Sequence, residues 1–249
     1  MTLDTGLVFM IVAGAAAGGF VSGVSGFAFG MVSLSIWSWT MEPSMLAPMV
    51  VFGSLAAQLV SIGAVRHALH GRLLLPFLIG GALGVPIGVR LLAGIDLGVF
   101  RAITGAALVF HGAVMLAAPR LGGRVHGGGR ITDGFVGLIG GIMGGLAGLS
   151  GVAPTLWSTL RGWDKDTQRA VFQTFNLSMH VLTLAGYLIG GTVTTAHATH
   201  FALMLPAIAV AAWLGARAYR RISERVFRRI VLVLLTVSGI VLLATGLRG

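Results

Sequence analysis

The amino-acid sequence predicts an all-α, polytopic membrane protein, and its composition carries most of that prediction. Of the 249 residues, 56% are hydrophobic and 10% are charged, whereas soluble domains carry about 25% charged residues. A soluble domain with so few charges would lack a polar surface, and a disordered chain would show the opposite composition. The 39 glycines follow no three-residue period, which excludes a collagen-like chain. Long charge-free stretches, each with room for a membrane-spanning helix, are the second supporting observation.

Charged residues mark where these stretches end, and three stretches are too long for a single membrane crossing. Residues 5–41 would form a helix of about 55 Å, against a hydrocarbon core of about 30 Å. We expect residues 5–41 and 134–160 to break at the glycine–serine motifs they share, and residues 170–216 to turn at Gly190. The ten predicted segments are 6–24, 27–40, 44–65, 73–93, 97–118, 133–149, 152–161, 169–190, 200–217 and 227–247.

The positive-inside rule favours this number of segments. With both termini outside, ten segments place all but three of the 17 basic residues on the inner side, and the three outside are Arg90, Arg101 and Arg248. The sequence leaves open whether segments 27–40 and 152–161 cross fully or form re-entrant hairpins. All basic residues except Lys165 are arginines, which is typical of a GC-rich bacterial genome. We therefore expect the inner membrane of a bacterium.

The two halves of the chain resemble each other in sequence. Residues 19–26 align with 144–151 at an offset of 125, and residues 99–101 align with 226–228 at an offset of 127. Because each half has five segments, an odd number, the second half must enter the membrane upside down. Inverted repeats with broken helices are typical of secondary transporters. The predicted units are a first membrane repeat at 5–119, a cytoplasmic linker at 120–132 and a second membrane repeat at 133–247.

A Gly-x-Ser-Gly motif occurs once in each half. It comprises Gly23, Ser25 and Gly26 in the first half and Gly148, Ser150 and Gly151 in the second. Glycine lets the backbone leave the helix, and a half-helix that starts after the break presents unpaired N–H groups and a positive dipole end. Two such ends from inverted halves would form an anion site near the midplane, with the serine hydroxyls as further donors. The alternative is close helix packing, which we expect for other small residues such as Gly14, Gly19 and Gly144.

Polar residues within the predicted segments are further candidates. Gln173 and Asn176 lie three residues apart on one face of an otherwise apolar helix, where they would donate to the oxygens of an anion or hold two helices together. Gln58 is the comparable residue of the first half. His111 and His180 are candidate proton-relay residues, because imidazole titrates near neutral pH. Each histidine is isolated in its segment, so packing explains it equally well.

Several other polar residues have ordinary explanations. We expect the charged residues of 161–169 to form a solvated loop with local ion pairs, and Trp37 and Trp157 to anchor the protein at the membrane interface. His197 and His200 fall in a predicted outer loop without an acidic or thiol partner, so no metal site is expected there. The chain has no cysteine, which excludes disulfides.

Residues 160–177 read LRGWDKDTQRAVFQTFNL and follow GLSGVAP at 148–154. Together with the first Gly-x-Ser-Gly motif, this string resembles the TauE/SafE sulfite exporter family, also called the 4-toluene sulfonate uptake permease family. The resemblance spans essentially the whole chain, although the first-half counterpart at 36–43, IWSWTMEP, lacks the basic residues. Members of the family are exporters or permeases for sulfite, sulfoacetate and related sulfur-containing anions. The resemblance therefore implies an anionic substrate.

The predicted function is export of small sulfur-containing anions (sulfite, sulfoacetate or related organosulfonates) by a secondary transporter that works by alternating access. Proton-coupled uptake of the same anions and a non-transporting membrane scaffold are the alternatives. The expected partners are the small anionic substrate and the lipid bilayer, and the sequence leaves homo-oligomer formation open. We expect no cofactor, no metal and no nucleic-acid partner. An enzyme is not expected, because no carboxylate lies inside a predicted segment and no nucleophile–base pair is evident.

Overall fold

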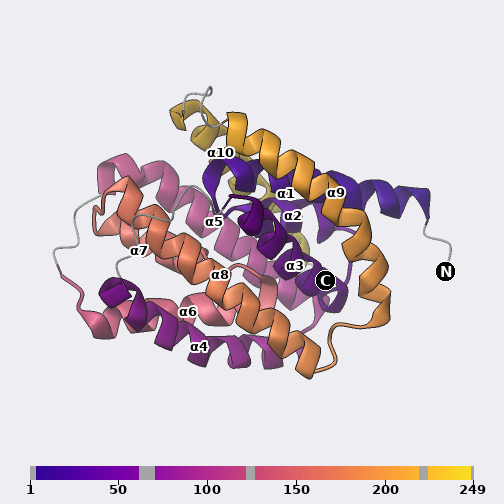
Figure 1. The fold of residues 1–249 in the computed structure, drawn as a ribbon, viewed down its shortest axis with the longest axis horizontal. Helices are drawn as coiled ribbons and strands as arrows, with labels where there is room; N and C mark the ends of the chain where they lie inside the picture. The colour runs from indigo at the N-terminus through magenta and orange to yellow at the C-terminus, as the bar shows by residue number, and fades with distance from the viewer. Residues whose placement is uncertain (1–3, 62–70, 122–126, 219–223, 248–249) are drawn as a thin grey trace.

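The computed structural model describes residues 4–61, 71–121, 127–218 and 224–247, and every regular element in these ranges is an α-helix (Figure 1). The helices are α1 (Thr5–Ser25), α2 (Phe29–Trp37), α3 (Pro43–Ser61), α4 (Gly71–Gly94), α5 (Leu97–Leu121), α6 (Arg130–Ala147), α7 (Val152–Leu160), α8 (Lys165–Ile189), α9 (Thr195–Ala218) and α10 (Glu224–Gly246). Each predicted segment corresponds to one helix. The all-α prediction is thereby confirmed.

Some helix boundaries differ from the prediction. Helix α9 begins at Thr195, so His197 and His200 are buried in a helix, and their expected position in an outer loop is wrong. The Thr194 N–H donates to Nδ1 of His197 at 3.1 Å, and this contact closes the start of the helix. Helices α5 and α6 also extend into the predicted linker at 120–132.

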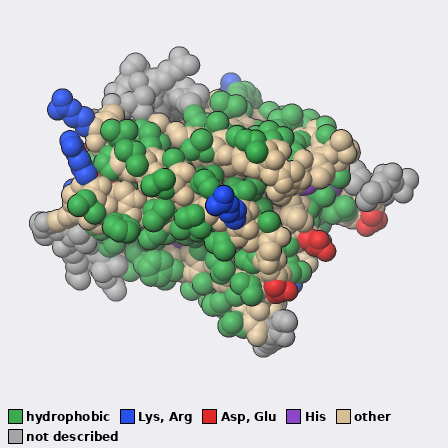
Figure 2. All heavy atoms as spheres, turned by 90° about the horizontal axis from the view of Figure 1, so that it is seen from below, with side chains coloured by type: hydrophobic (Ala, Val, Ile, Leu, Met, Phe, Trp, Pro, Cys, Tyr) green, Lys and Arg blue, Asp and Glu red, His purple; other side chains and the backbone are tan. Residues whose placement is uncertain are grey.

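The surface is that of a multi-pass membrane protein. Five helices of the described chain are long and apolar enough to cross a bilayer, and these are α1, α3, α4, α5 and α9. Hydrophobic side chains are spread across the whole face shown in Figure 2, and charged side chains on it are few. Phe9 and Ile189 are 70% and 89% exposed. In water, exposed apolar residues of this size and number would cause aggregation, whereas lipid solvates them.

Helices α4 and α6 pack closely and run in the same direction. A Cβ atom at Gly80 would collide with the carbonyl of Gly134, and eight residues further on a Cβ at Gly88 would collide with the carbonyl of Ile142. Residue numbers increase in the same direction along both helices at this contact, so the helices are parallel. Small residues allow this approach of two backbones, as is usual between membrane helices.

Two other helix pairs use the same kind of packing. In the α1–α9 pair, Gly19 lies against Ile208 and Gly23 lies against Ala212, so these helices are also parallel. In the α5–α10 pair, Gly246 lies beside Ala102 and Gly112 beside Thr236, so these helices are antiparallel. The predicted packing role of Gly19 is confirmed.

Candidate functional site

Each Gly-x-Ser-Gly motif lies where one helix ends and a short helix begins. Helix α1 ends at Ser25 and is followed by Gly26 at φ 89°, and α6 ends at Ala147 and is followed by Gly148 at φ 69°. Only glycine adopts these left-handed conformations without strain. The helices that follow, α2 and α7, have nine residues each, which corresponds to about 14 Å, or half the hydrocarbon thickness of about 30 Å.

The two breaks lie next to each other in the interior. A Cβ at Gly30, in the first turn of α2, would be 2.9 Å from the carbonyl oxygen of Gly148. A Cβ at Gly151, at the start of α7, would be 3.2 Å from the ring of Phe27. The sequence predicted that the two breaks would face each other, and the structure brings them into contact. Gly23 lies apart from them, inside α1 at the contact with α9.

At the first break, the hydroxyl oxygen of Ser25 accepts hydrogen bonds from the backbone just before α2. Its Oγ accepts from the backbone N–H of Ala28 at 3.2 Å and lies 3.4 Å from the N–H of Phe27. Ser25 thus accepts from backbone N–H groups of the turn before α2, which the sequence assigned to an anion. The hydroxyl hydrogen of Ser25 is not used in these two contacts, and the residue is only half-buried.

At the second break, Ser150 is fully buried and joins a polar cluster with α8. Its Oγ donates to Oδ1 of Asn176 at 3.0 Å and lies 3.4 Å from Nε2 of His180. Gly151 is required for this arrangement, because a Cβ there would lie 2.7 Å from Nδ2 of Asn176. The structure therefore brings together Ser150, Gly151, Asn176 and His180, which are four of the predicted site residues.

His180 connects this cluster to the first half of the chain. The Gln58 amide, on α3, donates from Nε2 to Nδ1 of His180 at 3.1 Å, and Nε2 of His180 donates to the Gly148 carbonyl at 3.1 Å. Because the Gly148 carbonyl can only accept, Nε2 of His180 carries a proton in this arrangement. We refer to Gln58, Ser150, Asn176 and His180 as the central polar cluster.

Gln173 differs from the cluster in having an unsatisfied side chain. It is 3% exposed, and neither its Nε2 nor its Oε1 has a hydrogen-bond partner among the described residues. It lies three residues before Asn176 and so on the same side of α8. An unpaired buried amide costs about 1–3 kcal/mol, and such groups in native proteins call for an explanation such as ligand binding.

His111, the second candidate proton-relay residue, is buried on α5. Its ring meets the ring of Phe27 edge-on, with the centroids 6.4 Å apart. Phe27 also packs against Phe172 of α8, with centroids 4.7 Å apart. His111 therefore contacts Phe27, which lies beside the first break.

Comparison with known families gives a clear result. A family model described as "Sulfite exporter TauE/SafE" matches residues 10–242 of the chain. The chain belongs to the TauE/SafE sulfite exporter family. This confirms the resemblance seen in the sequence, and the family consists of membrane transporters and not of enzymes. No curated protein and no solved structure matches the chain.

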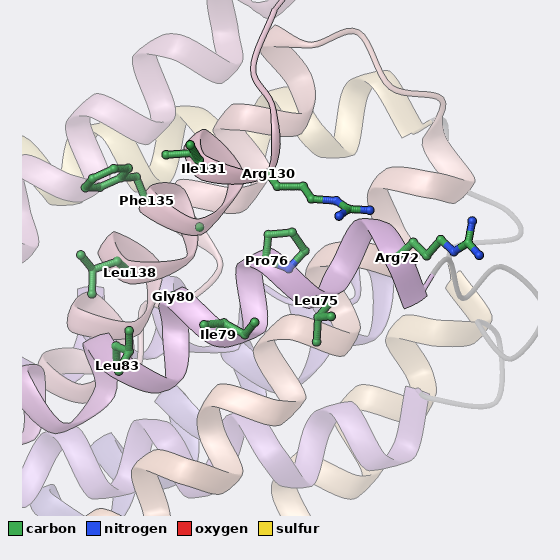
Figure 3. Close-up of a pocket in the computed structure, with 11 residues that line it drawn as sticks. Arg72, Leu75, Pro76, Ile79, Gly80, Leu83, Arg130, Ile131, Phe135 and Leu138 are labelled. Carbon is green, nitrogen blue, oxygen red and sulfur yellow. The ribbon is translucent and has the colours of Figure 1, made fainter.

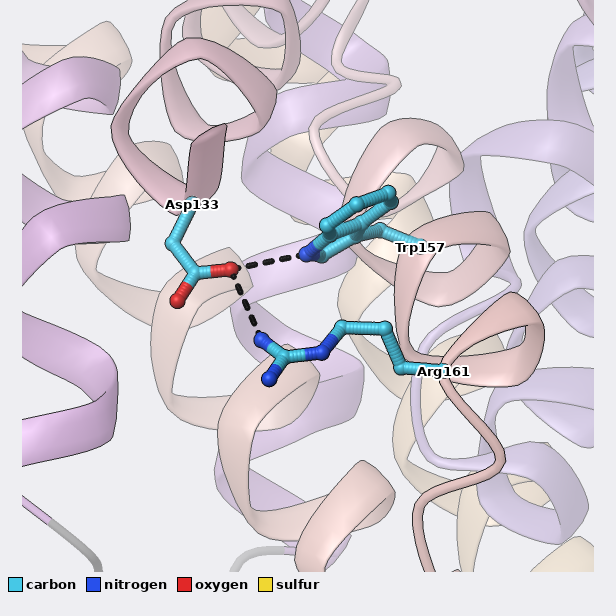
Figure 4. Close-up of polar contacts among 3 residues, drawn as sticks. All are labelled: Asp133, Trp157 and Arg161. Atoms are coloured by element: carbon cyan, nitrogen blue, oxygen red, sulfur yellow. Dashed lines mark hydrogen bonds and ion pairs between the residues drawn. The ribbon is translucent and has the colours of Figure 1, made fainter. Parts of the chain in front are cut away.

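Sequence reasoning missed two polar contacts that hold the short helices of this TauE/SafE protein. At the end of α7, Oδ1 of Asp133 accepts from Nε1 of Trp157 at 2.7 Å and forms an ion pair with Arg161 at 3.2 Å (Figure 4). At the end of α2, the Arg101 guanidinium donates to the carbonyls of Ser38 and Trp39 at 2.9 and 3.4 Å. Arginine at a helix C-terminus satisfies carbonyls that have no partner within the helix.

Two expectations from the sequence are wrong at Asp133. It is 4% exposed in the first turn of α6, so a carboxylate does lie inside one of the helices. It also pairs with Arg161, which the sequence placed in a solvated loop. No local pattern joins these residues, because they lie 28 positions apart.

In this TauE/SafE protein, Asp133→Ala is expected to destabilise the fold by about 1–3 kcal/mol, because it leaves the Trp157 N–H and the half-buried Arg161 without their acceptor. Asp133→Asn keeps an oxygen for Trp157 and loses only the charge, so its effect should be smaller. Thermal unfolding in detergent measures both variants. Equal losses for the two would mean that the ion pair, and not the Trp157 hydrogen bond, carries the interaction.

Proposed function

We propose that this TauE/SafE protein is a secondary transporter that exports small sulfur-containing anions, such as sulfite, sulfoacetate or related organosulfonates, across the inner membrane of a bacterial cell. The observation that carries the proposal is the unsatisfied amide of Gln173, which lies one helical turn from the central polar cluster. Amide and hydroxyl donors replace the water that an oxyanion loses on leaving solution. The family membership supports a sulfur-containing anion.

Helix pairing supports the inverted repeat that alternating access requires. If α1 to α5 correspond to α6 to α10, exchange of the halves turns the α1–α9 pair into the α4–α6 pair, and both pairs are parallel and glycine-rich. The same exchange turns the α3–α9 pair into the α4–α8 pair, and it turns the α5–α10 pair into the same pair again. A contact pattern that survives this exchange is expected of two related halves around a pseudo-two-fold axis.

Helix direction supports a reversal of the chain at both breaks. Helices α5 and α10 are antiparallel, so the chain must reverse its direction an odd number of times between them. If each of the other connections reverses the chain, the number is odd only when the chain also reverses at the α6–α7 break. Helices α1 and α9 are parallel, and with the second reversal in place this requires another at the α1–α2 break. We propose that α2 and α7 are the second arms of re-entrant hairpins. Their short length and buried breaks suit backbone that protein covers at membrane depth.

The electrical potential of the cell favours export without a coupling ion. Moving one negative charge out of a negative-inside cell is favourable by about 2.3 kcal/mol per 100 mV. We assign His180 to holding Gln58 and Gly148 in place and not to carrying protons, because both of its ring nitrogens already have partners.

Flux in proteoliposomes tests the proposal. Sulfite, sulfoacetate and taurine are loaded into vesicles that carry the protein, and their exit is measured with and without a pH gradient. At least one of these compounds should leave faster than from empty vesicles, with no effect of the pH gradient. Ser150→Ala should slow that flux by about tenfold, because it removes the hydroxyl that holds Asn176 in the central polar cluster.

Three results would count against the proposal in different ways. Flux of none of the anions would remove the substrate assignment. Flux that follows the pH gradient and loses this dependence in His111→Ala or His180→Ala would favour proton-coupled uptake. Unchanged sulfonate resistance of cells that carry Ser25→Ala, Ser150→Ala or Gln173→Ala would favour a membrane scaffold.

A further inference from the structure

A groove on the surface of the protein, between α4 and α6, is separate from the proposed anion site. Its volume is about 550 Å³, within the range of about 300–1,000 Å³ that is usual for ligand sites. The side chains of Arg72 and Arg130 lie toward the same end of the groove, and Leu83 lies toward the other end (Figure 3). Gly80 and Gly134 line it where the two helices meet, because neither has a side chain to fill the space.

The walls of the groove are apolar and open to the surroundings of the protein. Leu75 and Ile79 on α4 are 56% and 57% exposed, and Phe135 on α6 is 61% exposed. From Arg72 to Leu83 the helix rises by about 16 Å, which is close to half the hydrocarbon thickness of about 30 Å. The groove therefore has the depth of one leaflet and the lining of an acyl-chain site.

The charged end of the groove carries positive charge only, among its lining residues. Arg72 and Arg130 are exposed, and neither forms an ion pair with any residue that the structure describes. Asp133, one turn along α6 from Arg130, is buried and already paired with Arg161, the residue after α7. In the sequence, the segments 62–70 and 122–126 that precede the two helices contain arginine and no carboxylate.

We propose that this α4–α6 groove binds one anionic phospholipid, with an acyl chain along the apolar walls and the phosphate on Arg72 and Arg130. Guanidinium groups match phosphate oxygens in geometry and charge, and basic pockets between membrane helices bind anionic head groups. By the positive-inside rule the lipid belongs to the inner leaflet. A second copy of the chain fits less well, because a symmetric dimer with its axis normal to the membrane would bring the arginines of both copies to one level.

Native mass spectrometry of the detergent-purified protein tests this proposal directly, with palmitoyl-oleoyl phosphatidylglycerol and palmitoyl-oleoyl phosphatidylcholine offered at equal concentration. The wild-type protein should retain one phosphatidylglycerol in preference to phosphatidylcholine. The double variant Arg72→Gln/Arg130→Gln should lower this preference by about tenfold. Arg90→Gln, an exposed arginine at the opposite end of α4, is the matched control and should keep the preference. Circular dichroism and elution volume check that each variant is folded.

Gly134→Leu separates the acyl chain from the head group. A Cβ at Gly134 meets only the Pro76 carbonyl, at 3.7 Å, so a larger side chain fills the groove and leaves both arginines in place. This variant should also lose the retained lipid, and excess glycerol 3-phosphate should not displace lipid from the wild-type protein. Equal retention of the two lipids, an equal effect of Arg90→Gln, or a dimer that Arg72→Gln/Arg130→Gln dissociates would overturn the proposal.

Discussion

Gly141→Ala is expected to destabilise the folded protein by about 1–3 kcal/mol, although it adds a single methyl group. The new Cβ would overlap the Gly81 carbonyl oxygen and lie 2.8 Å from both the carbonyl carbon and the Cα of Gly81. These are backbone atoms of α4, so no rotamer change relieves the contact and the two helices must separate. Alanine is the better helix former by about 1 kcal/mol, and this gain does not offset the lost packing. Thermal unfolding in detergent should show a lower midpoint.

Gly134→Ala is the matched control for Gly141→Ala, because it makes the same change two turns earlier on the same helix. Its Cβ finds only the Pro76 carbonyl at ordinary van der Waals distance, so stability should be unchanged or slightly higher. A similar loss of stability in both variants would show that glycine matters along α6 for a reason other than contact with α4.

The number of helices and the places where they break could be predicted from the sequence because both depend on local signals. Charged residues end membrane segments, and Gly26 and Gly148 occur where the chain needs a left-handed residue. The approach of the two breaks was also predicted, from the sequence similarity of the two halves. Gly23 shows the limit of the same reasoning, because a glycine at a helix contact and a glycine in a turn look identical in sequence.

Contacts between distant segments could not be predicted from one sequence. Trp37 was expected at the membrane interface, but it is fully buried, and its Nε1 donates to the carbonyl of Met10 at 3.0 Å. The missing side chain of Gly14 makes room for its ring. Gln58 and His180 each stood out as polar residues in apolar segments, yet nothing in the sequence joins two residues 122 positions apart. Periodicity assigns a residue to a face of its helix and does not name the partner of that face.

Gln173→Met should separate a ligand-binding role from a packing role, because it changes transport and stability in opposite directions. Methionine fills a similar volume without polar atoms, so the variant removes a buried amide that has no partner in the described part of the chain. Removing an unsatisfied polar group is neutral or stabilising, by up to about 1 kcal/mol. If Gln173 donates to the anion, flux should fall by about 10- to 100-fold, because a hydrogen bond to a charged group contributes about 1.5–3 kcal/mol.

Asn176→Leu provides the contrast, because Asn176 accepts from Ser150 and its removal leaves that buried hydroxyl without its acceptor. It should lower the unfolding midpoint as well as the flux. Unfolding temperature and proteoliposome flux, measured on the same preparations, distinguish the two roles. If Gln173→Met loses stability and retains flux, the amide holds helices together. A stable Gln173→Met protein that no longer moves the anion would mean that the amide is kept for the substrate, at a cost in stability that binding offsets.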